Sequence, residues 1–270
     1  ESRPNLFEAR DKEKKDMSIE SMADYFGVSP EIEAFIPELL VDFYELGSYP
    51  DRIVEMARRA GLPSKNAKVL DLGCGKGAVS LAFANAMGAR VHGIDAIGPF
   101  IDEANRRADE AGLGALCTFE QGDLQSVIEE GGDSDLVLLI SVGDVLGDMA
   151  ETVRALRKVV RPGGLMIIDD GWSEKEVDFQ GYEEMVTHDQ ALAQLTCEGD
   201  EILEELVNDA EDIREMNRIY QARIEAQVAR LSKEHPEHAE AFEAYSAKEK
   251  QEVEILDNDV VCATWILRRV

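Results

Sequence analysis

The sequence has few cysteines and no long apolar run. Its four cysteines, Cys74, Cys117, Cys197 and Cys262, are widely separated and form no Cys-x-x-Cys pair. This spacing excludes a disulfide-rich scaffold and predicts reduced thiols and no metal site. No stretch approaches the roughly 18 consecutive apolar residues of a membrane span, and the charged segment 1–16 lacks the apolar centre of a signal peptide. We therefore expect a cytoplasmic protein that does not insert into membranes.

Positive charge is also scarce. The chain has 28 Lys and Arg residues against 56 Asp and Glu residues, which gives a formal net charge of -28 at pH 7. Phosphate backbones are bound by clusters of Lys and Arg, so this balance disfavours DNA, RNA and anionic membranes as partners. A small molecule is the expected ligand.

Two regions differ in their hydrophobic period. Over 17–60 apolar residues recur at helical spacing, and Pro30 and Pro50 stand where helices can begin. Over 67–170 short apolar runs alternate with helical stretches, which is typical of a mostly parallel sheet. A helix over about 149–160 should end at the turn 161–164, because Pro blocks the helix and Gly frees the backbone. The expected strands are 68–72, 90–95, 116–121, 136–141 and 165–169.

A third region, 173–270, predicts a helix near 188–197, a strand at 201–207, and two acidic helices over 210–256 that break at His235-Pro236. A final strand at 259–267 is apolar enough to lie inside the sheet. One face of the first acidic helix carries apolar residues at helical spacing, namely Ile213, Met216, Ile219, Tyr220, Ile224, Val228 and Leu231.

The clearest motif is Val69-Leu-Asp-Leu-Gly-Cys-Gly-Lys-Gly77, an apolar strand that enters a turn with three glycines and then a helix. Glycines let the backbone turn sharply and approach a ligand closely, and the free N–H groups of a helix start favour polar groups. The spacing differs from the Gly-x-Gly-x-x-Gly of dinucleotide-binding enzymes, which argues against a nicotinamide cofactor. The alternative is an ordinary tight turn without a ligand.

This motif resembles the first motif of the class I, Rossmann-like S-adenosylmethionine-dependent methyltransferases, and Asp71, Gly73, Gly75 and Gly77 match it position by position. The resemblance covers about 65–172. It implies a three-layer α/β sandwich with a mostly parallel seven-stranded sheet and an antiparallel last strand. N-terminal helices and a helical insertion between the last two strands would be additions to that fold.

The resemblance also implies a cofactor site. Gly73 and Gly75 would pack against the amino-acid part of S-adenosylmethionine, and Asp71 would orient its amino group. Asp95, at the tip of the second strand, would hold two ribose hydroxyls, and Asp123 would accept from the adenine amino group. The alternatives are a helix N-cap at Asp95 and a turn or cap at Asp123. The implied set is Asp71, Gly73, Cys74, Gly75, Gly77, Asp95, Ala96, Ile97, Gly122, Asp123, Leu124 and Ser141.

The segment 1–62 and the insertion 209–256 are expected to form a lid over a core domain of 63–208 and 257–270, because methyl transfer needs a pocket that excludes water. The alternative is that the apolar face of the insertion packs on the core domain or on a second subunit of a homodimer. Candidates for the pocket wall are Tyr25, Tyr44, Tyr49, Asp144 and Trp172, although aromatic residues more commonly pack in cores.

We therefore expect methyl transfer to a small-molecule acceptor, with S-adenosylhomocysteine as the product. The methyl sulfonium is already activated, so the protein mainly aligns the reactants. If a general base is needed, the candidates are Asp144, Asp170 and His188. Asp170, with Asp169, has the alternative role of ending the fifth strand, and His188 that of a helix cap. The alternative functions are a non-catalytic protein that binds the cofactor or its product, and an NAD(P)-dependent oxidoreductase.

Overall fold

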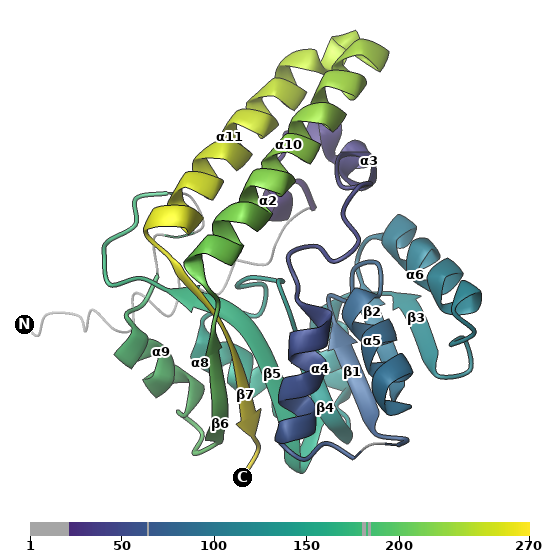
Figure 1. Ribbon diagram of the computed structural model, residues 1–270, viewed down its shortest axis with the longest axis vertical. Helices are drawn as coiled ribbons and strands as arrows, with labels where there is room; N and C mark the ends of the chain where they lie inside the picture. Colours follow the sequence, from purple (N-terminus) through teal and green to yellow (C-terminus); the bar gives the residue numbers. More distant parts are fainter. Residues whose placement is uncertain (1–21, 64, 180–181, 183–184) are drawn as a thin grey trace, which may run out of the picture.

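A mixed sheet lies at the centre of the described structure (Figure 1), a computed structural model that describes residues 22–63, 65–179, 182 and 185–270. The strand order is β3-β2-β1-β4-β5-β7-β6, and β7 runs antiparallel to both neighbours. This is the predicted seven-stranded sheet with an antiparallel last strand. The strands are β1 Lys68–Leu72, β2 Arg90–Asp95, β3 Cys117–Gln121, β4 Ser134–Leu139, β5 Val160–Trp172, β6 Glu201–Val207 and β7 Val261–Arg268.

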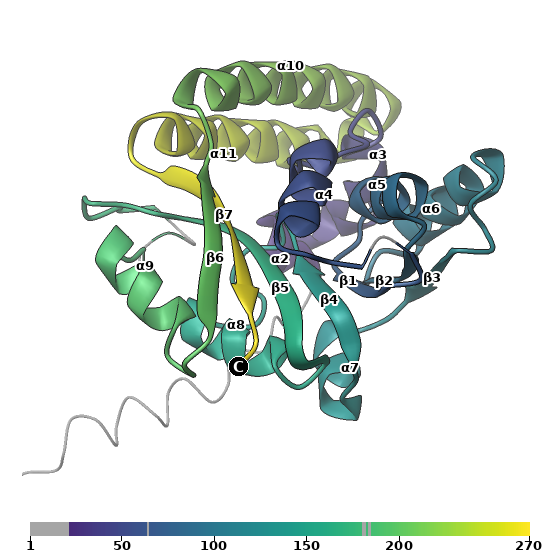
Figure 2. The ribbon, with the colours of Figure 1, turned by 60° about the horizontal axis from the view of Figure 1, so that its bottom comes forward.

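Helices cover both faces of the sheet and make a three-layer sandwich (Figure 2). One face carries α4 Pro50–Arg59, α5 Ala78–Met87 and α6 Gly98–Glu110, and the other carries α7 Leu124–Glu130, α8 Met149–Leu156 and α9 His188–Leu195. The apolar run of β4 explains why both faces are covered, since successive side chains of a strand point to opposite sides. Leu136 and Leu138 enter the first core cluster, whereas Val137 and Leu139 enter the second.

A cap of helices sits at the carboxyl edge of the parallel strands (Figure 1). We use the name cap for two parts. The first part contains α2 Met22–Phe26, the 3-10 helix η2 Pro30–Phe35 and α3 Ile36–Leu39. The second is the hairpin of α10 Ala210–Glu234 and α11 Ala239–Asn258, joined by η3 Pro236–His238. A third core cluster, which includes Ile32, Leu39, Ile224 and Phe242, joins the two parts. The N-terminal helices and the hairpin thus pack against each other.

The helices of the cap and α4 match the sequence expectation at Pro30 and Pro50, and α10 departs from it at one position of its apolar face. The N-terminal region is a series of short helices, because Gly27 and Gly47 have positive φ angles and Pro30 and Pro50 start new helices. Residues 17–21 of the expected helical stretch lie outside the described residues. On α10, Ile219 is exposed, and Asn217 is buried instead, where its side chain donates to Asp257 Oδ1 at 2.7 Å.

The fifth strand is longer than predicted. The helix α8 ends at Leu156, and β5 begins at Val160, which pairs with Ser134, and continues to Trp172. The turn expected at 161–164 is an irregularity inside this strand, because its pairing to β4 resumes at Leu165 and Gly163 hydrogen-bonds with Arg269. Pairing partners distant in sequence decide this boundary. β4 has the expected length but lies two residues earlier, because it runs from Ser134 to Leu139 and not over 136–141.

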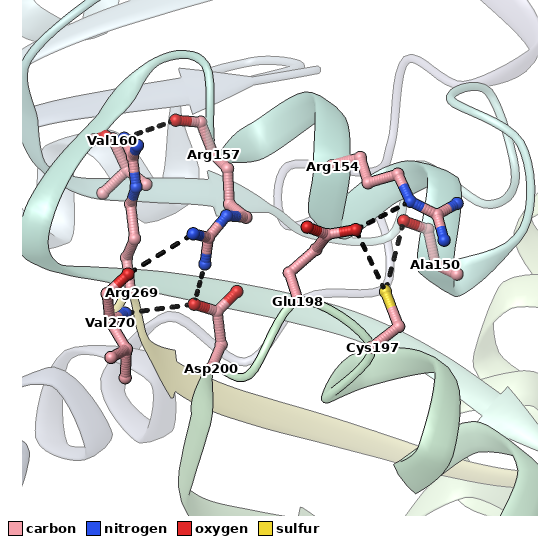
Figure 3. A network of polar contacts seen from close by, with 9 residues as sticks. All are labelled: Ala150, Arg154, Arg157, Val160, Cys197, Glu198, Asp200, Arg269 and Val270. Carbon is pink, nitrogen blue, oxygen red and sulfur yellow. Dashed lines mark hydrogen bonds and ion pairs between the residues drawn. The ribbon is translucent and has the colours of Figure 1, made fainter.

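Figure 3 shows a polar network at the opposite end of the sheet from the cap. The buried carboxylate of Asp200 accepts from the Arg157 guanidinium and from the Val270 N–H, the latter at 3.1 Å. Arg269 Nη1 donates to the carbonyl of Arg157 at 2.6 Å and to that of Val160. The network connects the end of β7 to α8 and β5, and so helps to hold the register of the antiparallel strand.

Candidate functional site

The glycine turn between β1 and α5 lies at the carboxyl edge of the sheet. Gly73, Gly75 and Gly77 have φ angles of 73°, 52° and 80°, a region that side-chain-bearing residues rarely adopt. A Cβ atom on Gly73 would collide with Val142, so the turn also needs glycine for close packing. The N–H groups of Gly73 and Cys74 donate to the carbonyl of Ile94 at 2.8 and 3.0 Å. The turn is therefore held tightly against β2.

Asp71 supports this turn from inside the protein. The residue is 2% exposed, and its Oδ2 accepts a hydrogen bond from Ser80 Oγ at 2.6 Å, which joins β1 to α5. Burial raises the pKa of the Asp71 carboxyl to about 6. Asp71 was expected to orient a ligand amino group. In the structure, one oxygen of its carboxylate joins β1 to α5.

Asp95 brings the tip of β2 to the glycine turn. Its Oδ2 accepts from the Gly75 N–H at 2.8 Å, and its Oδ1 accepts from the Ile97 N–H at 2.9 Å. Burial raises its pKa, although the residue keeps part of its surface exposed. The N-cap of α6 is Ile97, so the alternative of Asp95 as that cap is wrong.

The neighbouring strand tip contributes an exposed acid. Asp123 is the N-cap of α7, because its Oδ2 accepts from the Ser126 N–H and hydroxyl at 2.9 and 2.8 Å, so the expected alternative role is present. The Gly122 N–H donates to the carbonyl of Asp95 at 3.0 Å, which brings Asp123 next to the tip of β2. Of the other expected residues nearby, Cys74, Ile97 and Leu124 are buried, and Ala96 is exposed.

A second polar group lies at the carboxyl side of β4 and β5 and includes Thr264 of the antiparallel β7. Ser141 has a φ angle of 55°, and its hydroxyl donates to Asp169 Oδ2 at 3.2 Å. Thr264 Oγ1 donates to the other carboxylate oxygen at 3.0 Å. Asp170 Oδ1 accepts from the Gly171 N–H at 2.7 Å. Burial raises the pKa of both Asp169 and Asp170 to about 6.

Sequence reasoning gave these two acids the alternative role of ending the fifth strand, which is wrong because β5 continues to Trp172. It also missed Asp169 and Thr264 as members of a polar group. The sequence does contain a signal for this group, because two adjacent carboxylates directly follow the apolar run Leu165–Ile168. Ligands of open α/β sheets bind at the carboxyl ends of such strands.

The other base candidates have different surroundings. Asp144 is exposed in the segment that follows β4, and its charge contributes to the raised pKa of Asp170. His188 Nε2 lies 2.8 Å from Glu205 Oε1, and its ring packs on Trp172 with 4.4 Å between centroids. Trp172 is itself buried in the second core cluster. His188 and Trp172 thus pack together beside β6.

Residues 40–49, which we call the strap, connect α3 to α4 and run from the cap down to the sheet (Figure 1). The strap holds two of the expected pocket tyrosines. The Tyr44 ring lies 3.9 Å from Arg107 Cζ, and the Tyr49 ring lies 4.6 Å from Arg52 Cζ. The buried Tyr49 hydroxyl has no hydrogen-bond partner among the described residues. Tyr25 is in α2, and its side chain lies outside the described part of the structure.

Within the described residues, no group of three or more His, Cys, Asp or Glu side chains has an arrangement that would hold a metal ion. No helix in that part of the chain is both long enough and apolar enough to cross a membrane.

Curated relatives of the chain are methyltransferases. It is 34% identical over 106 residues to a ubiquinone biosynthesis O-methyltransferase of Azorhizobium caulinodans. The aligned residues are 39% of this chain and 41% of that protein. It is 30% identical over 145 residues to the enzyme of the same name from Methylocella silvestris, and the aligned residues are 54% of each chain. The chain thus matches about half or less of the length of these relatives.

Solved structures share the fold. A S-adenosylmethionine-dependent methyltransferase from Thiobacillus denitrificans, in complex with S-adenosylhomocysteine, superposes with a TM-score of 0.73 at 19% identity, over 87% of this chain and 98% of that one. A second such complex, from Geobacter sulfurreducens, gives a TM-score of 0.73 at 20% identity, over 90% and 99%. The family model described as a methyltransferase domain matches residues 63–251. The chain therefore belongs to this methyltransferase-domain family, as the glycine turn and the strand order had indicated.

Proposed function

We propose that this protein binds S-adenosylmethionine across the glycine turn and catalyses transfer of its methyl group to a small-molecule acceptor. The observation that carries the proposal is the hydrogen bond from the Gly75 N–H to Asp95 Oδ2. It places a partly exposed carboxylate at the tip of β2 directly beside the turn, at the sheet edge where open α/β folds bind nucleosides.

The residues at this edge fit the cofactor. Each oxygen of Asp95 accepts one backbone N–H, and a carboxylate has about four acceptor sites, so it retains capacity for ribose hydroxyls. Asp123 is exposed nearby. Its Oδ2 caps α7 through Ser126, so its Oδ1 is available to accept from a ligand. The cofactor, when bound, supplies an activated methyl group on a positively charged sulfur. The acidic residues Asp71, Asp95 and Asp169 provide a favourable field for that charge.

On the acceptor side we propose Asp170 as the general base, in preference to Asp144 and His188. Its pKa of about 6 makes it a stronger base than an ordinary aspartate while leaving it ionised at neutral pH. His188 is a weaker candidate because its Nε2 already interacts with Glu205. Hydroxyl compounds are the first acceptor class to test, because the curated relatives are named as O-methyltransferases.

Calorimetry of the full chain with S-adenosylmethionine, S-adenosylhomocysteine and NAD tests the cofactor. We expect the first two to bind and NAD not to bind. Asp95→Ala should weaken binding about 100-fold, since it removes a charged acceptor from the turn. Asp102→Ala, which removes an exposed carboxylate from α6, is the matched control. Preferential NAD binding, or unchanged affinity in Asp95→Ala, would contradict the proposal.

A screen of small hydroxyl and amine compounds with labelled S-adenosylmethionine separates an enzyme from a non-catalytic binding protein. We expect label to reach an acceptor, and Asp170→Asn to reduce the rate constant about 100-fold or more with little change in cofactor affinity. Cofactor binding without transfer to any acceptor would favour the non-catalytic alternative.

We also propose a cytoplasmic location, a homodimer, no interaction with nucleic acid and a lid formed by 1–62 and 209–256. The net charge of -28 supports the absence of nucleic-acid binding. The joint core of the cap supports a lid built from both segments. Cell fractionation, light scattering and a DNA-binding assay at low salt test the first three expectations.

A further inference from the structure

Lys76, inside the glycine turn, is buried. The residue is 5% exposed, and its ammonium donates to the carbonyl of Leu40 at 2.5 Å and to that of Val41 at 3.2 Å. The ammonium also lies 5.2 Å from the centre of the Phe100 ring. A lysine is strongly hydrated in water, so its burial is retained only where protein acceptors replace that hydration. Here both carbonyl acceptors belong to the strap, just after α3 ends.

The strap lies on the turn that Lys76 belongs to. A Cβ atom built on Gly75 would be 2.6 Å from Leu46 Cδ1, so Leu46 covers the backbone of Gly75. A Cβ atom on the next strap residue, Gly47, would be 3.5 Å from Ser141 Oγ. The strap thus covers Gly75 and passes near Ser141, two residues of the proposed cofactor site. A ligand that approaches Gly75 from this side meets Leu46 first.

Leu46 holds an unfavourable backbone conformation at this contact. Its φ angle is 47°, which costs a leucine about 1 to 2 kcal/mol relative to an ordinary conformation. Such a conformation persists only where surrounding contacts impose it. The strap has further contacts with two other elements: the Asp42 carbonyl and carboxylate accept from Arg223 and Gln227 of α10, and Tyr44 stacks on Arg107 of α6.

We propose that the strap closes over the glycine turn and must lift for the cofactor to enter and leave, and that Lys76 is the positioning residue that holds it closed. This inference rests on the proposed function of the turn. Lys76 acts through the Leu40 and Val41 carbonyls, and Leu46 is the side chain that these bonds keep on Gly75. The hydrogen bonds to α10 link the same movement to the hairpin of the cap.

The test uses the full chain with S-adenosylhomocysteine as the probe, and two readouts. Hydrogen exchange of the strap amides reports opening in the ligand-free protein, because Phe43 and Ser48 donate backbone hydrogen bonds within the strap. Stopped-flow displacement reports ligand dissociation. We expect Lys76→Met to accelerate exchange of 41–48, but not of β1 or β4, and to increase the dissociation rate about tenfold. Lys158→Met, at an exposed lysine just before β5 begins, is the control.

Two further variants separate positioning from stability. Lys76→Arg keeps a cationic donor and should restore part of the slow dissociation. Leu46→Gly keeps the Lys76 contacts and relieves the positive φ angle, so it should speed both association and dissociation without lowering the unfolding temperature. If wild type binds the probe but Lys76→Met leaves its dissociation rate or the strap exchange unchanged, the inference is overturned. Failure of wild type to bind the probe would overturn the proposed function itself.

Discussion

The sheet and the cap are stabilised by separate apolar cores. The two clusters on the faces of the sheet contain buried residues of every strand except β6, whose side chains pack against them. The buried cluster in the cap takes only Ile97 and Phe100 from outside the segments 23–43 and 224–245. A region with its own core and few shared contacts opens as a unit of its own. The sheet thus sets the geometry of the glycine turn, while the cap has a core of its own, as the proposed lid requires.

The largest expected effect comes from Phe242→Ala. Phe242 is 0% exposed in the cap and contacts Phe35 edge-on at 5.3 Å between ring centroids. We expect the free energy of unfolding of the cap to fall by about 3 to 5 kcal/mol, with the sheet amides still protected in hydrogen exchange. Leu138→Ala, in β4 and equally buried, should instead reduce protection in both regions. Equal loss of protection everywhere in Phe242→Ala would show that the two cores unfold together.

Gly73→Ala tests how rigidly the sheet side holds the turn. The new Cβ atom would meet Val142 at a φ angle of 73°, so we expect a loss of about 2 to 4 kcal/mol from strain and overpacking combined. Gly143→Ala is the matched variant, because its φ angle of 66° carries the same strain with no atom within 4 Å of the new Cβ. Chemical denaturation compares the two. A smaller loss in Gly73→Ala than in Gly143→Ala would mean that the turn adjusts to the added methyl group.

A pH series tests Asp71, the acid buried beneath the turn. Burial raises its pKa from 3.8 to about 6 in the folded protein, so the folded state binds the proton more tightly than the unfolded chain does. The resulting stability is present below pH 3.8 and is lost as the pH rises through about 6. Since one pKa unit corresponds to about 1.4 kcal/mol, the loss is about 3 kcal/mol.

Asp71→Asn removes this titration while keeping an acceptor for Ser80. Urea unfolding at pH 4 and at pH 7 should therefore show a difference that is smaller in the variant than in wild type. Asp102→Asn, at an exposed position of α6, serves as the control for the loss of one charge. An unaltered pH dependence in Asp71→Asn would show that the buried carboxyl does not titrate in this range.

The smallest expected effect concerns Thr264, which donates to Asp169 Oδ1 at 3.0 Å. Thr264→Val removes that donor, so we expect the pKa of Asp169 to rise further and the stability at neutral pH to fall by about 1 to 2 kcal/mol. An NMR titration of the carboxyl carbons measures the pKa. Thr118→Val, at an exposed position of β3, should change neither quantity.

Local patterns in the sequence were sufficient for much of the fold. The predicted bounds of β1, β2 and β6 agree with the structure, because each is an apolar or alternating run ended by turn residues. The glycine turn and the break between α10 and α11 are local signals of the same kind. Features that depend on distant partners were missed, as the irregular pairing inside β5 shows.

The same distinction applies to the candidate site. The Asp169 carboxylate accepts from the hydroxyls of Ser141 and Thr264, which are 28 and 95 residues away in the chain. The local hydrophobic pattern does not predict contacts between such distant residues. The sequence did not indicate a role for Lys76, because lysines are usually exposed to solvent. This lysine is buried because the strap passes over it and provides carbonyl acceptors. The cofactor residues named from the sequence remain a prediction that the binding experiments address.

The attachment of the hairpin to the sheet has a consequence for engineering. The hairpin departs after Val207, which pairs with Ala263, and the Asn208 N–H donates to the Cys262 carbonyl at 2.9 Å. Its two ends are therefore joined by strand pairing before either helix begins. Because lengthening or shortening an insertion between joined ends costs little free energy, the hairpin can be replaced by one of another length without disturbing the sheet. Under the proposed function, chimaeras made at this junction would test whether the hairpin determines the acceptor while the glycine turn stays unchanged.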